Sequence, residues 1–556
     1  MTNQKGVSIR YGDVAPEAKE NFVAKSDQSQ FDTLQQLQRY NVNFPNFDNP
    51  CDSYSTVLDG TALPIPSNPE TENFGFWSSY VSDAVGNFLE PIILELKSEG
   101  YYTSSGLTLT FDTYNNIYPR GVNIEWLRVT PESYEVISQK DFTPDSAIYF
   151  CENKVERYNR VVMRFPAMNM PYSRVKLRSI DYGRGTIFYG RELRNVGIIQ
   201  ELDPVSTQIS INTADFIIDS AGSTSYTFQR KQPLNVYFNG ELLATTFVKQ
   251  ATRQSKFLWN IQSEDYIGIM DGVPYHGGIY YGANAVDVLT DIFNVAKVPF
   301  VVDDIFADAK VTGYIPYTTC REALMQVAFA IQAVVDTSNS DVVKVFALSD
   351  EVTQTIPLNR IMQGQNFVDE ETVTGVEVTA HAYKKISETQ TVYDANESGT
   401  GQNIFVKFSE PLHDLSISNG TIKDSGTNYA VINADDSYCV LSGQKYEHTT
   451  QTKRKNDETI LSSEIERIVA VDNATLVSSA NLDNVLQKCY NWFTRINTTN
   501  LKIIEGRHDD GTSDQKVIVG DVITCDTEYL GEVTGRIIRQ TFGLAGGITV
   551  KDSVLK

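Results

Sequence analysis

The chain has 556 residues, of which 41% are hydrophobic and 21% are charged, so we expect several folded domains rather than a disordered chain. Its formal net charge of −23 argues against a nucleic-acid-binding surface, which needs clustered lysine and arginine. The six cysteines form no CxxC pair, which argues against a zinc ribbon or a disulfide framework. We also find no membrane span, because no apolar run reaches about 18 residues.

The first 70 residues are predicted to form an N-terminal arm or linker. The start lacks a basic-then-apolar export signal, so we expect synthesis in the cytoplasm without export by a signal peptide. A short helix is expected over 30–41, and a Pro/Asn-rich run follows it. Two interpretations remain open for this run: an ordered arm that lies along a neighbouring protein, or a disordered linker.

Residues 71–190 are predicted to form an antiparallel β-sandwich, a jelly roll. Six segments in this region alternate apolar and polar residues, a period of two that buries one face of each strand. Trp126 lies on this alternation, which predicts that it is a core residue. The six segments are 91–98, 106–112, 122–129, 134–142, 160–166 and 174–183.

Strands continue over 191–275, with a type I′ hairpin turn expected at Asn239-Gly240. An α+β unit is then predicted over 276–350. One helix begins after the N-cap Asn284, and a second begins at a capping box formed by Thr319 and Glu322. The apolar stripes that we expect to face the core are Val286, Leu289, Ile292, Phe293 and Ala296 on the first helix, and Leu324, Val327, Ala328 and Ile331 on the second.

A strand is expected after each of these helices, at 298–304 and as a hairpin over 333–348. Residues 351–556 return to strands, interrupted by one helix over 479–493, and a closing meander runs over 521–551. The predicted fold class is therefore mainly β with a small α+β insertion.

A search for catalytic residues leads us to predict that the protein is not an enzyme. The histidines, at positions 276, 381, 413, 448 and 508, form no HExxH or HxH pattern, which argues against a histidine-based metal site. The sequence also lacks a GxSxG elbow, a Walker loop and a GxGxxG motif after a strand, which argues against the common hydrolases and nucleotide enzymes. Cys320 stands at the first turn of a helix, where a thiol can be activated, but we favour packing because an apolar helical face surrounds it.

Acidic pairs occur at Asp303–Asp304, Asp369–Glu371 and Asp509–Asp510, and two carboxylates are what glycoside hydrolysis requires. Such pairs arise by chance among 70 acidic residues, so we favour solvated loops. The segment 508–514, "HDDGTSD", combines the oxygen donors of a weak calcium site with the composition of a polar turn, and we favour the turn. No catalytic residue, cofactor or metal site is predicted.

The region 71–190 resembles the discoidin-like, galactose-binding type of carbohydrate module. The resemblance is carried by "GFWSSYVSDAVGNF" with Trp77 and Asp83, by the strand Gly106–Asp112, and by Trp126. Sandwich modules carry ligands on the loops between strands, and aromatic rings can stack on sugars. We therefore name Trp77, Tyr114 and Tyr118 as candidate glycan contacts.

Residues 198–556 resemble the baseplate-hub or tail-associated proteins at the tip of phage tails and related contractile injection devices. The residues that carry the resemblance are "ISINTADFIID", "WNIQSEDYIGIMDGVPYHGGIYYG", "GYIPYTTCREALMQVAFAIQAVVDTSNSDVVKVF" and the closing "VGDVI" and "GRIIRQTFGLAGGI". The third segment is the most telling, because its Gly-x-Ile-Pro turn and Thr-x-Arg-Glu-Ala-Leu helix start follow the family pattern.

This resemblance implies a virion protein at the tail tip, with β-barrel parts at 191–275 and 351–556. It further implies a homotrimer that joins the distal tail or tail-tube protein to the tip and forms a channel for the tape-measure protein and DNA. Receptor-binding proteins and host cell-wall glycans are further expected partners. Two alternatives remain: a carbohydrate-binding adhesin of the tail tip, and a cell-wall hydrolase.

Overall fold

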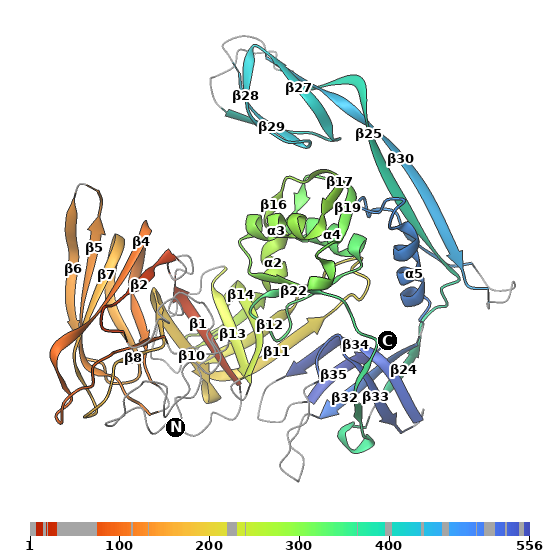
Figure 1. Ribbon diagram of the computed structural model, residues 1–556. Helices are drawn as coiled ribbons and strands as arrows, with labels where there is room; N and C mark the ends of the chain where they lie inside the picture. The colour runs from red at the N-terminus through yellow and green to blue at the C-terminus, as the bar shows by residue number, and fades with distance from the viewer. Residues whose placement is uncertain are drawn as a thin grey trace. The chain divides into compact units, whose positions relative to one another are not determined.

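The computed structural model divides the chain into two compact units (Figure 1). Unit 1 comprises Met1–Glu192 and Ser220–Leu242, and unit 2 comprises Leu193–Asp219 and Leu243–Lys556. The mainly β fold with small α+β parts is confirmed. The structure describes residues 7–14, 18, 21–29, 75–112, 115–131, 133–219, 231–238, 241–363, 365–394, 403–434, 439–458, 466–495, 497–504, 517–528, 531–543 and 550–555.

Three sequence predictions lie outside the described residues: the helix over 30–41, the Asn239-Gly240 turn and the segment 508–514. Among the helices that are described, none is long and apolar enough to cross a membrane.

Unit 1 is built on an antiparallel sheet with the strand order β2-β4-β7-β5-β6, in which β9 also pairs with β4. Its buried face carries the core, with Trp126, Phe111 and Phe165 fully buried. A short pair, β3 with β8, and the strands β10, β1 and β13, which pair in that order, complete the described strands of this unit. The strands are β1 (Val7–Val14), β2 (Val23–Lys25), β3 (Phe76–Trp77), β4 (Asn87–Thr110), β5 (Pro119–Val129), β6 (Tyr134–Phe142), β7 (Ile148–Met168), β8 (Lys176–Leu177), β9 (Ser179–Asp181), β10 (Gly183–Tyr189) and β13 (Pro233–Phe238).

Two strand predictions for unit 1 were wrong in detail. The expected strand 174–183 is divided among β8, β9 and the start of β10. The expected strands 91–98 and 106–112 are a single strand, the 24-residue β4. The polar segment between them suggested a turn. Instead, three successive register shifts against β7 between Lys97 and Gly106 keep the segment extended. Gly106 has φ 148°, and a Cβ there would meet the carbonyl oxygen of Cys151 at 2.2 Å, so this bulge needs a glycine.

Unit 2 contains a sheet in which strands from the two ends of the unit lie side by side. The described order is β14-β15-β12-β11-β34-β35-β32-β24, and β33 pairs with both β34 and β23. Because β11 pairs with β34, the regions predicted separately at 191–275 and 351–556 share this sheet. The strands are β11 (Leu193–Glu201), β12 (Thr213–Asp219), β14 (Glu241–Arg253), β15 (Leu258–Glu264), β23 (Val352–Ile356), β24 (Asn366–Asp369), β32 (Asn497–Ile504), β33 (Val522–Thr527), β34 (Gly531–Gly543) and β35 (Val550–Leu555).

The predicted α+β unit and its helix caps are confirmed. Helix α3 (Ala285–Ala296) begins after Asn284, whose side chain accepts a hydrogen bond from the Val286 N–H. Helix α4 (Cys320–Ile331) begins after Thr319, whose hydroxyl accepts from the Glu322 N–H. Their buried faces share one core, to which Val286 and Ile331 contribute only partly buried side chains. The other elements are α2 (Tyr266–Asp271), β16 (Pro274–Tyr275), β17 (Gly278–Asn284), β18 (Phe300–Val302), β19 (Lys310–Ile315), β20 (Thr318–Thr319), β21 (Val334–Asp336) and β22 (Val343–Phe346).

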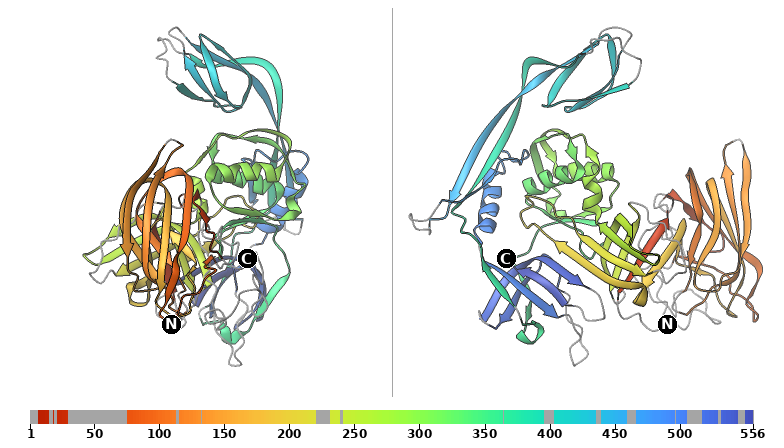
Figure 2. Two further views of the ribbon diagram at one scale, coloured as in Figure 1. Left: turned by 60° about the vertical axis from the view of Figure 1, so that its left-hand side comes forward. Right: turned by 180° about the vertical axis from the view of Figure 1, so that it is seen from behind.

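Strands β25 (Gly375–Asp394) and β30 (Val440–Asn456) pair as a long antiparallel two-stranded arm, which we call the long hairpin although β26–β29 lie between the two strands in the chain. This arm runs beside helix α5 (Leu482–Phe493), as Figures 1 and 2 show. The two share a core of aliphatic side chains, which fixes α5 against the hairpin. The helix predicted over 479–493 is therefore confirmed, with a later start. The remaining strands near the hairpin are β26 (Asn403–Lys407), β27 (Leu412–Ser418), β28 (Gly420–Ser425), β29 (Tyr429–Ala434) and β31 (Ile468–Val471).

The buried carboxylate of Asp265 connects three parts of unit 2. It accepts hydrogen bonds from the Gly268 N–H at 3.1 Å, which caps α2, and from the Asn212 N–H at 3.0 Å, just before β12. The Thr337 hydroxyl, just after β21, donates at 2.5 Å. Burial raises the pKa of Asp265 to about 6, against the lowering effect of these three bonds.

We predict that Asp265→Ala lowers the free energy of unfolding by about 2–4 kcal/mol. Three buried donors left unpaired cost about 1–3 kcal/mol each. The substitution also removes the desolvation cost of the buried carboxylate, about 3 kcal/mol for a pKa that is raised by roughly two units, but the unpaired donors cost more. Urea unfolding at pH 7 would measure the change, with the exposed Asp308→Ala as a control; equal stability of the two variants would contradict the role of Asp265.

Candidate functional site

The structure does not bring the three candidate glycan contacts together. The Trp77 side chain is 1% exposed and lies 4.8 Å from the buried Lys176 Nζ, so its ring offers no face to a sugar. Tyr118 is partly buried against the core of unit 1, and Tyr114 lies outside the described residues. Trp126 is a core residue, as predicted.

The other candidates occupy structural positions. Cys320 is fully buried, and burial raises the pKa of its thiol to about 11, so it packs, as predicted, in the shared core of α3 and α4. Asp303 and Asp304 begin a short 3-10 helix, while Glu370 accepts a hydrogen bond from Thr498 and Glu371 pairs with Arg467. Among the described residues, no group of three or more His, Cys, Asp or Glu side chains is arranged to hold a metal ion.

Two of the histidines form a hydrogen-bonded pair on the long hairpin. His381 Nδ1 lies 3.0 Å from His448 Nε2, and His381 Nε2 lies 3.0 Å from the Asp472 carbonyl oxygen. Because that carbonyl can only accept, His381 carries its proton on Nε2 and accepts from His448. Burial and the second imidazole lower the pKa of His381, which favours its neutral form in this structural contact between β25 and β30.

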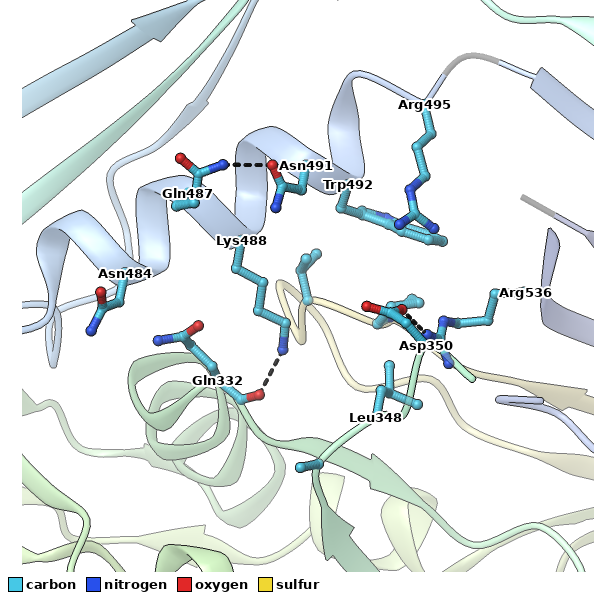
Figure 3. A pocket seen from close by; sticks show the side chains of 13 residues that line it. Gln332, Leu348, Asp350, Asn484, Gln487, Lys488, Asn491, Trp492, Arg495 and Arg536 are labelled. Atoms are coloured by element: carbon cyan, nitrogen blue, oxygen red, sulfur yellow. Dashed lines mark hydrogen bonds and ion pairs between the residues drawn. The ribbon is translucent and has the colours of Figure 1, made fainter. Parts of the chain in front are cut away.

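A pocket of about 590 Å³, lined by both polar and apolar residues, lies beside α5 (Figure 3). One wall is the face of α5, and the opposite side combines four apolar residues with Gln332, Asp350 and Arg536. The α5 wall consists of Asn484, Gln487, Lys488, Asn491, Trp492 and the following Arg495. The opposite side consists of Pro204, Val205, Gln332, Ala347, Leu348, Asp350 and Arg536.

Arg536 is held rigidly at the edge of this pocket. Its side chain is only 3% exposed, and its guanidinium donates to the Gly520 carbonyl at 2.7 Å and the Ser349 carbonyl at 2.9 Å. It also donates to the Asp350 carboxylate at 2.5 Å. Asp350 is largely exposed, so this ion pair marks the boundary between the protein interior and solvent.

Lys488 is a partly buried cation in the pocket wall. Its ammonium donates to the Gln332 carbonyl oxygen at 2.6 Å, the only hydrogen bond found for it among the described residues. Desolvation lowers the pKa of Lys488 to about 8, and the positive charge of Arg536 acts in the same direction. The negative charges of Asp203 and Asp350 and the thiol of Cys489 oppose this shift.

Amide side chains and an indole complete the α5 wall. The Gln487 amide donates to Asn491 Oδ1 at 2.6 Å and accepts from Lys455, so Asn491 keeps its own N–H groups for other partners. The Arg495 guanidinium lies over the Trp492 ring, 5.4 Å from its centroid. Three cations and one carboxylate, Asp350, thus line the pocket, and the negative charge of Asp203 also acts on Lys488.

Sequence reasoning predicted α5 but missed this pocket. The one local signal is the run Lys488, Trp492, Arg495 on one face of a helix in an acidic chain. Apart from Arg536, the opposite side comes from residues about 140 to 290 positions before α5, whose proximity no sequence pattern indicates.

A second feature of unit 2 is an open sheet edge. Strand β24 is the last strand of the described order, paired on one side with β32, and all four of its residues are exposed. The chain before it continues along β32 through the Ile361–Ile503 bridge and the Met362 N–H, which donates to Lys502. Along this edge Met362, Phe367 and Val368 are each about 40% exposed.

We predict that Lys488 titrates near pH 8, because its ammonium is desolvated in the pocket wall. NMR of lysine Cε nuclei would follow the titration, with the resonance assigned by Lys488→Gln. Lys453, which pairs with Asp483 at 2.7 Å and does not line the pocket, provides the reference resonance. A common midpoint for both lysines would show that the pocket leaves Lys488 solvated.

The chain matches no protein-family model and no curated protein. Several solved structures are similar to 66% of the chain. They include the tail protein of Neisseria meningitidis MC58 (13% identity, TM-score 0.42, 93% of that chain) and the 43 kDa tail protein of prophage MuSo2 from Shewanella oneidensis (9%, 0.40, 94%). Another is the prophage tail protein gp18 of Listeria monocytogenes EGD-e (11%, 0.38, 91%). The solved structures named here are all tail proteins, and at these values the likeness assigns no role to any residue.

Proposed function

We propose that this chain is a structural protein of a phage-type tail, a baseplate hub at the distal end that assembles as a homotrimer. The observation that carries the proposal is the open, apolar edge formed by residues 361–369 in unit 2. The residue-level resemblance of 198–556 to hub proteins supports the same assignment.

An exposed strand edge with apolar side chains is more typical of a protein that assembles with other chains than of a monomer. Its unpaired N–H and C=O groups are a template for another strand, and monomeric proteins usually protect such edges with charges, proline or bulges. Here the edge presents Met362, Phe367 and Val368 beside a single charged residue of β24, Asp369. We propose that a neighbouring copy covers it through a head-to-tail contact, which closes into a ring when the rotation is threefold.

The net charge fits a ring that surrounds a passage. A negative wall repels DNA and so does not retain it during transit. The partners that we propose are the distal tail or tail-tube protein on one side, and the tape-measure protein with DNA as cargo of the channel. We assign the protein to the virion, at the tail tip, after synthesis in the host cytoplasm.

A second proposed role is contact with host-surface glycans through unit 1. The buried Asp112 accepts a hydrogen bond from the N–H of Asn115 at 3.0 Å, three residues before Tyr118, and Tyr114 stays a candidate from the sequence alone. Trp77 is left out of this proposal because it is buried. A pull-down of the full chain on host cell-wall polysaccharide tests the role, and absence of binding would remove it.

We propose no enzymatic activity. The acidic groups that suggested a cell-wall hydrolase, Asp303–Asp304 and Glu370–Glu371, serve as a helix start and as partners of Thr498 and Arg467. Zymography on cell walls distinguishes the two assignments, because a lytic band would favour the hydrolase.

We predict that the double substitution Phe367→Asp and Val368→Lys converts an associated form of the protein into monomer. Charges on the open edge disfavour pairing with another strand and cost little in the monomer, where both side chains are already substantially exposed. Light scattering at matched concentrations measures the mass.

The matched control is Ile305→Asp, which replaces an apolar side chain that is 73% exposed on a different part of unit 2. We expect this variant to associate like the wild type. A strictly monomeric wild-type protein, or equal loss of association in both variants, would contradict the role of the edge.

A further inference from the structure

The α5 pocket, defined by the lining residues above, has the charge and shape of a binding site that the hub role does not require. Figure 3 shows Lys488, Asn491 and Trp492 projecting from α5 toward Gln332, Leu348, Asp350 and Arg536. Its volume of about 590 Å³ lies within the range of about 300–1,000 Å³ typical of ligand sites.

The charge balance of the pocket points to an anionic ligand. The Arg536 guanidinium already donates hydrogen bonds to two carbonyl oxygens and to Asp350. We therefore expect it to attract an anion through its positive charge and not through further hydrogen bonds. Lys488 donates once, to Gln332, and an ammonium has three N–H donors. Arg495 is exposed and rests on the Trp492 ring, which holds its guanidinium at the pocket mouth. Lys488 and Arg495 therefore remain to bind a carboxylate.

The two unlike walls favour an extended peptide. Side chains of an extended chain alternate between opposite sides, so one apolar residue can face Val205 and Leu348 while its neighbour faces Lys488. The amides of Asn484 and Asn491 match peptide N–H and C=O groups. They are seven residues apart on α5, about 10 Å along the axis, which corresponds to roughly three residues of extended peptide.

An acidic sugar fits less well. Sugar recognition commonly uses an open aromatic face, and the Arg495 guanidinium lies over the Trp492 ring. The aliphatic wall of Pro204, Val205, Ala347 and Leu348 also offers no hydrogen bonds to hydroxyl groups from its side chains.

We propose that the α5 pocket binds an extended segment of a partner polypeptide that carries alternating apolar and carboxylate side chains, with Lys488 and Arg495 as the carboxylate-binding residues. Charge complementarity selects this partner, because an acidic segment is repelled by most of the chain and attracted at this pocket. The inference does not depend on the trimer, since every lining residue belongs to one copy of unit 2.

The test uses the full chain and a capped hexapeptide of alternating leucine and aspartate, measured by calorimetry at pH 7 and low salt. The same peptide with asparagine in place of aspartate is the matched probe, and a galacturonic-acid trimer represents carboxylate sugars. We expect the aspartate peptide to bind at least tenfold more tightly than either of the other two.

Substitutions then locate the binding. Lys488→Gln and Arg495→Gln should each weaken binding of the aspartate peptide by about tenfold, corresponding to roughly 1.4 kcal/mol. Arg495 is exposed, so its variant tests the pocket even where Lys488→Gln impairs folding. Lys453→Gln removes an exposed lysine that pairs with Asp483 on α5, and it should leave affinity unchanged.

The pH dependence gives an independent check. Binding needs charged Lys488, so it should be strongest well below pH 8 and should weaken as the pH rises through 8 toward 9. The charged groups that face this lysine are Asp203, Asp350 and Arg536, and burial raises the pKa of the neighbouring Cys489 thiol to about 12.

Four outcomes would overturn the proposal: no saturable binding of the aspartate peptide, equal binding of the asparagine peptide, tighter binding of the galacturonate trimer, or equal loss of affinity in Lys453→Gln. Each of these outcomes leaves the light-scattering test of the open edge unaffected, so failure of the pocket and failure of the hub assignment are distinguishable.

Discussion

The carboxylate of Asp265 is the interaction on which the organisation of unit 2 depends. Its three donors come from the start of α2, from the residue before β12 and from the turn after β21. Asn212 extends the network, because its side chain accepts from the Glu201 N–H and donates to Thr337. One buried charge thus ties the sheet to the α+β unit. Its raised pKa shows that desolvation is only partly offset by these bonds.

The same joining of distant segments creates the α5 pocket. The hairpin of β25 and β30 holds α5 through a shared apolar core, and β34 brings Arg536 to the opposite side. Lys488 reaches across to the Gln332 carbonyl, which ends α4 at its left-handed C-cap residue. A terminal helix carbonyl is a natural acceptor for a lysine. The pocket is therefore built from helix ends and strand ends that are held together by the surrounding cores.

The elements with strong local signals were predicted correctly. Asn284 and Thr319 cap their helices because a short polar side chain can satisfy an otherwise unpaired helical N–H, whatever the rest of the chain does. Local patterns were less reliable where bulges intervene, as in β4, because an unpaired residue in a bulge interrupts the alternation without ending the strand. Trp77 shows a further limit: its residue type suits a ligand contact, but only packing decides that it is buried.

By itself, the sequence determined the mainly β composition, the two capped helices, the core position of Trp126 and the acidic balance, because these depend on residue type and local periodicity. Only the tertiary structure decided the pairing of β11 with β34, the open edge at β24 and the pocket beside α5. Each of these brings together residues separated by more than a hundred positions. Their proximity follows from strand pairing and core packing, and neither leaves a signature in a single stretch of sequence.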